Sequence, residues 1–63
     1  MTQYQEILNN LRFGKCNYRN EKTGVSYSIG QVLMKICSDG SLKFFGNIES
    51  MARSINKFIK TGY

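Results

Sequence analysis

The apolar residues in the middle of the chain change phase at Gly30, and this shift limits the fold more than any other feature. Val25, Tyr27 and Ile29 occupy odd positions, whereas the next apolar residues fall at the even positions 32, 34 and 36. Alternation with a period of two is typical of strands with one buried face, and a slip of one residue moves the whole apolar set to the other face. The chain must therefore turn or bulge at Gly30.

A two-residue turn at positions 30 and 31 is the interpretation that we favour. Glycine stands first, as a type II′ hairpin requires. The turn predicts three apolar pairs on one face of a sheet: Ile29 with Val32, Tyr27 with Met34 and Val25 with Ile36. A bulge at Gly30 within one long strand is the alternative.

Two further loops follow from the same requirement that apolar residues share a face. They are a four-residue loop at 21–24 and a three-residue loop at 38–40, with Gly40 in the left-handed conformation. The predicted pairs are Tyr18 with Tyr27 and Cys16 with Ile29 across the first loop, and Ile36 with Leu42 and Met34 with Phe44 across the second. The region 15–45 is therefore predicted to be an antiparallel meander of three or four short strands.

A helix is predicted on each side of this meander. Thr2 and Gln5 have the spacing of a capping box, and a helix from about residue 3 to 13 would end at Gly14. Asn47 can cap a second helix that ends before Gly62. The apolar positions that define the two helical faces are Tyr4, Ile7, Leu8 and Leu11, then Ile48, Met51, Ala52, Ile55, Phe58 and Ile59. The predicted fold class is α+β, with both helices packed on one face of the sheet.

The length and composition limit the functions that this chain can have. The 63 residues allow a single domain, 1–63, with a small core. The chain has no histidine, four acidic residues and two distant cysteines, so zinc sites, catalytic triads and carboxylate pairs are poorly supported. We therefore expect no enzyme, no cofactor and no metal. No apolar run approaches the ~20 residues that span a bilayer, and we expect a cytoplasmic protein without a membrane partner.

The formal net charge of +5 points to an anionic partner. In the favoured register, Lys35 lies opposite Lys43 on the face of the sheet that neither helix covers, and like charges across a strand pair are unfavourable unless an anion joins them. The predicted nucleic-acid-binding residues are Arg19, Lys22, Ser26, Ser28, Lys35, Lys43 and Phe45. Arg53, Lys57 and Lys60 form a secondary basic face on the last helix. The alternative is that the lysines only protect strand edges from aggregation.

Part of the chain resembles a known DNA-binding domain. Residues 25–58 include Gly30-Gln31-Val32, Asp39-Gly40 and Lys43-Phe44-Phe45-Gly46, followed by a helix that begins near an acidic residue. This order resembles the plant ethylene-response-factor DNA-binding domain and the related arm-site-binding domain of phage and transposon tyrosine recombinases. The resemblance implies a three-stranded sheet that enters the major groove of DNA. A weaker similarity to double-stranded-RNA-binding domains lacks their lysine cluster at the start of the last helix.

Two functions are therefore predicted. The first is a small non-enzymatic protein that binds nucleic acid, with double-stranded DNA favoured, as a regulatory or accessory factor of a phage or other mobile element. The alternative is a small protein-binding inhibitor or adaptor that acts on an acidic host partner, with Phe45 and Leu33 as anchors. A homodimer that uses the same two residues is a further alternative.

Overall fold

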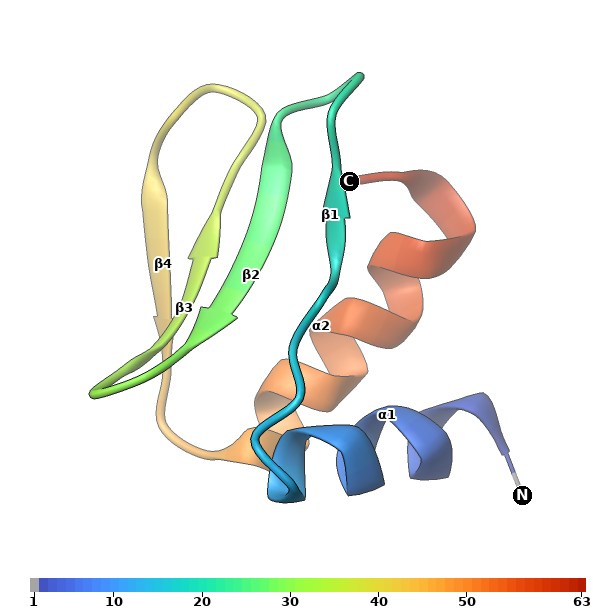
Figure 1. Cartoon of the computed structure of the whole chain (residues 1–63). Helices are drawn as coiled ribbons and strands as arrows, with labels where there is room; N and C mark the ends of the chain where they lie inside the picture. Colours follow the sequence, from blue (N-terminus) through green and yellow to red (C-terminus); the bar gives the residue numbers. More distant parts are fainter. Residues whose placement is uncertain (1) are drawn as a thin grey trace.

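The computed structural model describes residues 2–63 and has the predicted α+β architecture (Figure 1). Two helices pack on one face of a four-stranded antiparallel sheet in which neighbours in sequence are neighbours in space, in the order β1-β2-β3-β4. The elements are α1 (Gln3–Arg12), β1 (Arg19–Asn20), β2 (Val25–Ile29), β3 (Leu33–Ile36), β4 (Leu42–Phe45) and α2 (Ile48–Thr61). No helix in residues 2–63 is long and apolar enough to cross a membrane.

Both helix starts and the end of α2 form at the predicted residues, whereas α1 ends at Arg12, with Phe13 as its C-cap, one residue earlier than predicted. The Thr2 side chain accepts a hydrogen bond from the Gln5 backbone N–H at 3.1 Å, which caps α1. The Asn47 side chain accepts from the Ser50 N–H at 2.8 Å, which caps α2. Gly62 ends α2 in the left-handed conformation that glycine adopts without steric cost. Local capping chemistry therefore sets where both helices begin.

The core lies between the two helices and the β1–β2 half of the sheet. Its buried members come from three elements: Ile7, Leu8 and Leu11 of α1, Val25 and Tyr27 of β2, and Met51, Ala52, Ile55 and Phe58 of α2. Each belongs to an apolar face that the sequence predicts. Ile59 was expected on the same face, but it is 44% exposed because it lies at the margin of the helical stripe.

Two of the three predicted strand registers are confirmed. Arg19 pairs with Ser26 across the four-residue loop at 21–24, and the Tyr27 N–H donates to the Tyr18 carbonyl at 2.9 Å. Lys35 pairs with Lys43 across the loop at 38–40, in which Gly40 has a φ of +87°. These two loops have the predicted lengths.

The register between β2 and β3 differs from the prediction by one residue. Leu33 rather than Val32 pairs with Ile29, and Lys35 rather than Met34 pairs with Tyr27. The connection is therefore a three-residue loop at 30–32 and not the favoured two-residue turn. Paired residues share a face, so Lys35 lies on the same side of the sheet as the buried Tyr27.

The backbone of Gly30 does not have the conformation that the predicted two-residue turn requires. A type II′ turn needs a positive φ at its first central residue, and Gly30 is not among the glycines with a positive φ. Apolar residues occupy both phases of β3 and β4, so alternation alone does not identify the inner face. In the observed phase, Leu33 and Phe45 pack beside the core. All of β3 and β4 is consequently turned over relative to the predicted arrangement.

Candidate nucleic-acid interface

The register correction brings three lysines together on the helix side of the sheet. Lys35 of β3, Lys43 of β4 and Lys57 of α2 line one hollow, with a volume of about 270 Å³. Its other walls are Ser54, Phe58, Thr61 and Tyr63. The hollow therefore lies between the β3–β4 hairpin and the C-terminal half of α2. We call it the basic hollow.

Aromatic rings hold the two sheet lysines in place. The Lys35 Nζ lies 5.5 Å from the centroid of the Tyr27 ring, and the Lys43 Nζ lies 5.7 Å from that of Phe45. The two rings are stacked, with their centroids 6.3 Å apart. Ammonium groups over aromatic faces are attracted by the ring quadrupole. The rings thus form a platform that positions both cations.

The platform is fixed to α2 by polar and aromatic contacts. The Tyr27 and Ser54 hydroxyl groups form a hydrogen bond at 2.7 Å. The Phe58 ring contacts the Tyr27 ring edge-on at a centroid distance of 5.3 Å. Because Phe58 lines the basic hollow and is only 6% exposed, this side of the hollow is part of the folded core.

The C-terminal residue supplies a main-chain contact in the same place. The Lys35 Nζ donates a hydrogen bond of 2.7 Å to the main-chain oxygen of Tyr63. This segment is held by Thr23, whose hydroxyl donates to the Gly62 carbonyl at 2.7 Å. Oxygen acceptors therefore already meet one of the lysines.

The basic surface continues along α2 away from the hollow. Arg53 and Lys60 are exposed and lie four residues before and three residues after Lys57, which puts the three on one helical stripe. An Arg53 guanidinium N–H contacts the Ser50 hydroxyl at 3.4 Å. The predicted secondary basic face is therefore continuous with the two sheet lysines, a connection that the predicted register did not provide.

The electrostatics of the hollow favour an anion. None of the side chains that line it is acidic, and the main-chain oxygen of Tyr63 that accepts a hydrogen bond from Lys35 offsets only part of the positive charge. Lysines directly opposite each other on a strand pair repel, and a third lysine faces them from α2. The partial negative charge at the C-terminal end of α2 offsets only part of this repulsion. A bound phosphate would add further countercharge.

The other predicted site residues do not join this group. Ser26 and Ser28 are on the opposite face of the sheet from Lys35, because they pair with Ile36 and Met34. Arg19 shares their face because it pairs with Ser26, and Lys22 lies in the loop at 21–24. Phe45 is half-buried beneath Lys43 and not free on an open surface. The predicted single open basic face is therefore wrong, because the β2–β3 loop has three residues.

The open face of the sheet is apolar where it was expected to be basic. Its β3 and β4 positions carry Met34 and Ile36, paired with Phe44 and Leu42 respectively. Leu42 is 53% exposed and Phe44 is 61% exposed. We call these four residues the apolar patch. It covers the half of the open face that lies farthest from β1.

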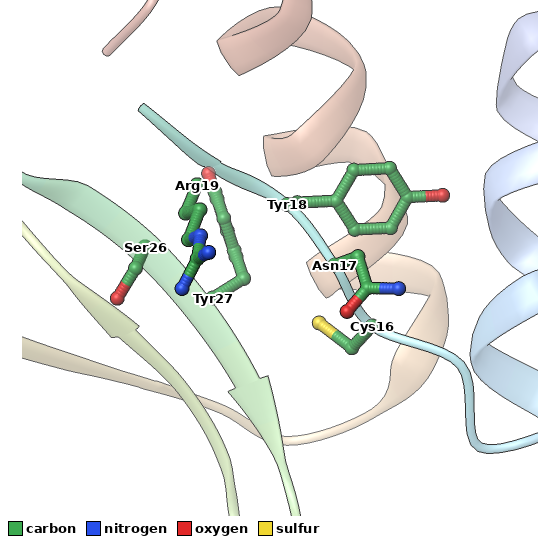
Figure 2. Close-up of a pocket in the computed structure, with 6 residues that line it drawn as sticks. All are labelled: Cys16, Asn17, Tyr18, Arg19, Ser26 and Tyr27. Atoms are coloured by element: carbon green, nitrogen blue, oxygen red, sulfur yellow. The ribbon is translucent and has the colours of Figure 1, made fainter. Parts of the chain in front are cut away.

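A second hollow opens where the chain before β1 separates from β2 (Figure 2). It has a volume of about 450 Å³ and is lined by Cys16, Asn17, Tyr18, Arg19, Ser26 and Tyr27. The Cys16 sulfur points toward β2 in this view. Burial raises the pKa of the Cys16 thiol, which makes the thiolate scarcer at neutral pH. This hollow therefore lacks an activated nucleophile.

Sequence reasoning missed the residues that join α2 to the sheet lysines. Ser54, Thr61 and Tyr63 were not predicted, and Lys57 was assigned to a separate face. The available signal was the spacing of Ser54, Lys57 and Thr61, which places them beside Phe58 on the helix surface. In residues 2–63, no three histidine, cysteine or acidic side chains are close enough to hold a metal ion.

Comparison of the chain with protein-family models, curated proteins and solved structures found no match. The resemblance to sheet-based DNA-binding domains therefore stays a prediction that only the geometry described above can inform. In those families the broad face of the sheet meets DNA, whereas here that face carries the apolar patch. The two sheet lysines and the basic stripe of α2 occupy a different side of the molecule.

Proposed function

We propose that this protein is a small non-enzymatic nucleic-acid-binding protein that contacts phosphates through the basic hollow and the adjoining stripe of α2. One observation carries the proposal. Lys35, Lys43 and Lys57 come from three separate elements and line one hollow that has no acidic side chain. Lysine and arginine contacts to phosphate supply most of the affinity for nucleic acid and do not depend on base sequence. Double-stranded DNA is the first ligand that we would test.

The arrangement supports backbone contacts more than base recognition. Two of the cations are held over aromatic rings, so little side-chain entropy is lost when they meet a phosphate. Ser26 and Ser28, which were predicted to face DNA from the sheet, lie on the other side of the sheet. We therefore propose binding that is only weakly selective for sequence, in place of the sheet-in-groove mode.

Salt dependence tests the electrostatic part of the proposal. If Lys35, Lys43, Arg53, Lys57 and Lys60 each meet one phosphate, the slope of log K against log salt for duplex DNA is about −4 to −5. Fluorescence anisotropy of a labelled duplex at several salt concentrations measures this slope. A slope near zero, or no binding at low salt, contradicts the proposal.

Charge reversal locates the site. We expect Lys35→Glu with Lys43→Glu to weaken duplex binding by more than tenfold and to reduce the slope by about 2, because two phosphate contacts are lost. The matched control is Arg12→Glu with Lys15→Glu, which changes the net charge equally at residues that do not line the hollow. Equal effects of the two double variants would show that only net charge matters.

A single helix substitution keeps the test independent of folding. Lys57 is exposed on α2, where a single substitution usually changes the free energy of unfolding little. We expect Lys57→Glu to leave the circular dichroism spectrum unchanged and to weaken duplex binding by several-fold. Single-stranded DNA and duplex RNA, titrated under the same conditions, establish which nucleic acid binds most tightly.

A further inference from the structure

The outer edge of β4 is unpaired, and Lys43 is the one charged side chain on this strand. The sheet order places β4 at one margin, and Figure 1 shows no other element beyond it. Its first three residues, Leu42, Lys43 and Phe44, are all exposed. The opposite edge, β1, is only two residues long. Proteins usually shorten, cover or bulge an edge strand, because its free backbone groups can pair with another chain.

The hydrogen-bonding pattern shows which backbone groups are free. The Cys37 N–H donates to the Ser41 carbonyl at 2.8 Å, so these two residues form a hydrogen-bonded pair across β3 and β4. Such pairs alternate along an antiparallel ladder, which makes Lys35–Lys43 the next hydrogen-bonded pair. The N–H and C=O groups of Leu42 and Phe44 therefore point away from the sheet. They offer two donors and two acceptors to an added strand.

The side chains of β4 define the chemistry that an added strand must have. Leu42 and Phe44 belong to the apolar patch on the open face, whereas Lys43 points to the other face beside the basic hollow. An incoming strand therefore needs apolar side chains next to Leu42 and Phe44 and a carboxylate next to Lys43. Lys43 would lie in a non-hydrogen-bonded pair of the new ladder, where opposing side chains are closest.

A second copy of this chain is a poor occupant of the edge. An antiparallel β4–β4 pair centred on the strand places Lys43 opposite its own copy. Each Lys43 also has Lys35 beside it, so four ammonium groups would line one row. Like charges directly opposite each other destabilise a strand pair. The charge on the edge therefore favours a partner with acidic residues.

We propose that β4 is a docking edge for an extended peptide segment of another protein in which apolar and acidic residues alternate. The segment adds a fifth antiparallel strand, with backbone hydrogen bonds to Leu42 and Phe44 and a carboxylate beside Lys43. Added strands of this kind gain affinity from the main chain and specificity from alternate side chains. This inference does not depend on nucleic-acid binding, because the main-chain groups of Leu42 and Phe44 carry it, and only Lys43 is shared with the basic hollow.

A short blocked peptide tests the inference. The probe is acetyl-Ser-Thr-Val-Glu-Val-Thr-Ser-amide, titrated into the ¹⁵N-labelled protein without nucleic acid. We expect the largest amide shifts at Leu42 and Phe44, together with slower hydrogen exchange of these two amides. The same peptide with N-methyl groups on both valines removes two donors, and we expect it not to bind. Shifts centred on any other element, or equal binding of both peptides, overturn the inference.

Charge exchange tests the role of Lys43. We expect Lys43→Glu to weaken binding of the Glu peptide about three- to tenfold and to strengthen binding of the matching Val-Lys-Val peptide by a similar factor. Lys15→Glu changes the net charge equally and should leave the preference for the Glu peptide in place. An unchanged preference in Lys43→Glu overturns the proposed register. Dimerisation through β4 in sedimentation experiments, with the Leu42 and Phe44 amides protected before peptide is added, also overturns it.

Discussion

The two halves of the sheet differ in which residue types they place on each face. In the β1–β2 half, apolar residues such as Val25 and Tyr27 face the helices, and Arg19, Ser26 and Ser28 face outward. In the β3–β4 half, Lys35 and Lys43 share the helix side with Leu33 and Phe45, and the apolar patch faces outward. Both halves alternate with a period of two, so alternation alone did not distinguish them. The difference shows that the first half serves the core, whereas the second half presents exposed side chains on both of its faces.

The largest effect is expected from truncating a buried aromatic residue of the first half. Truncation of an exposed aromatic residue of the second half is the comparison. Tyr27→Ala removes a 5%-exposed ring together with its hydrogen bond to Ser54 and its contacts with Phe45 and Phe58, and should lower the free energy of unfolding by about 3 kcal/mol. Phe44→Ala removes a ring that is 61% exposed and should cost less than about 0.5 kcal/mol. Urea unfolding measures both. Similar losses of unfolding free energy in the two variants would contradict the difference between the two halves.

An intermediate effect is expected from changing the loop between the halves. Gly30→Asn with Gln31→Gly introduces the Asn-Gly pair that most strongly favours a two-residue hairpin. We expect this variant to shift the pairing by one residue, so that Met34 rather than Lys35 lies opposite Tyr27. In the native pairing, the Lys35 Nζ lies 5.5 Å from the Tyr27 ring centroid, and we expect the ring to shift the proton resonances of the Lys35 side chain upfield. Loss of that shift, with a new Tyr27–Met34 nuclear Overhauser contact, reports the change.

Deletion of Gln31 is the control for this variant. It leaves two residues between Ile29 and Leu33, and it therefore keeps Lys35 opposite Tyr27 while shortening the loop. We expect the upfield shift of the Lys35 resonances to persist in the deletion variant. If the Asn-Gly variant also keeps this shift, then packing of Leu33 and Phe45 sets the register and loop length does not.

The smallest effect is expected from relieving the repulsion between the sheet lysines. Lys43→Gln removes one charge from the row formed with Lys35 and should raise the free energy of unfolding by about 0.3–0.5 kcal/mol at low salt. Added salt should reduce the gain, because screening already weakens the repulsion in the native protein. Thermal unfolding at two salt concentrations measures the difference, with Lys15→Gln as the control. A loss of stability would show that the contact between Lys43 and the Phe45 ring outweighs the repulsion.

Features determined by neighbouring residues were predictable. Thr2 and Asn47 cap the helices because their side-chain oxygens reach an N–H three residues later, which depends only on local geometry. The loop at 38–40 was predictable because Gly40 can adopt a positive φ and because Asp39 accepts hydrogen bonds from the Ser41 N–H and hydroxyl. These hydrogen bonds also lower the pKa of the Asp39 carboxyl group. Such interactions form without help from distant parts of the chain.

The candidate site was only partly predictable. Lys35 and Lys43 were correctly placed opposite each other, since that pairing depends on one short loop. The grouping of these two lysines with Lys57 around the basic hollow was missed, because it depends on which face of β3 and β4 packs against α2. Leu33 and Phe45 compete for that face with Met34 and Phe44, and each pair contains one aromatic and one aliphatic residue. The choice between two such similar pairs is not encoded in local alternation.

The amino-acid sequence by itself therefore determined the helices, the order of the strands and the positive charge of this protein. Only the tertiary structure decided which side of the second hairpin faces α2, and hence that the lysines gather in a hollow while the apolar patch faces outward. The physical reason is that capping and turn formation are short-range, whereas the orientation of a strand depends on the sum of its packing against residues far away in the chain. A change of one residue in the loop between β2 and β3 therefore changes all of these packing interactions at once.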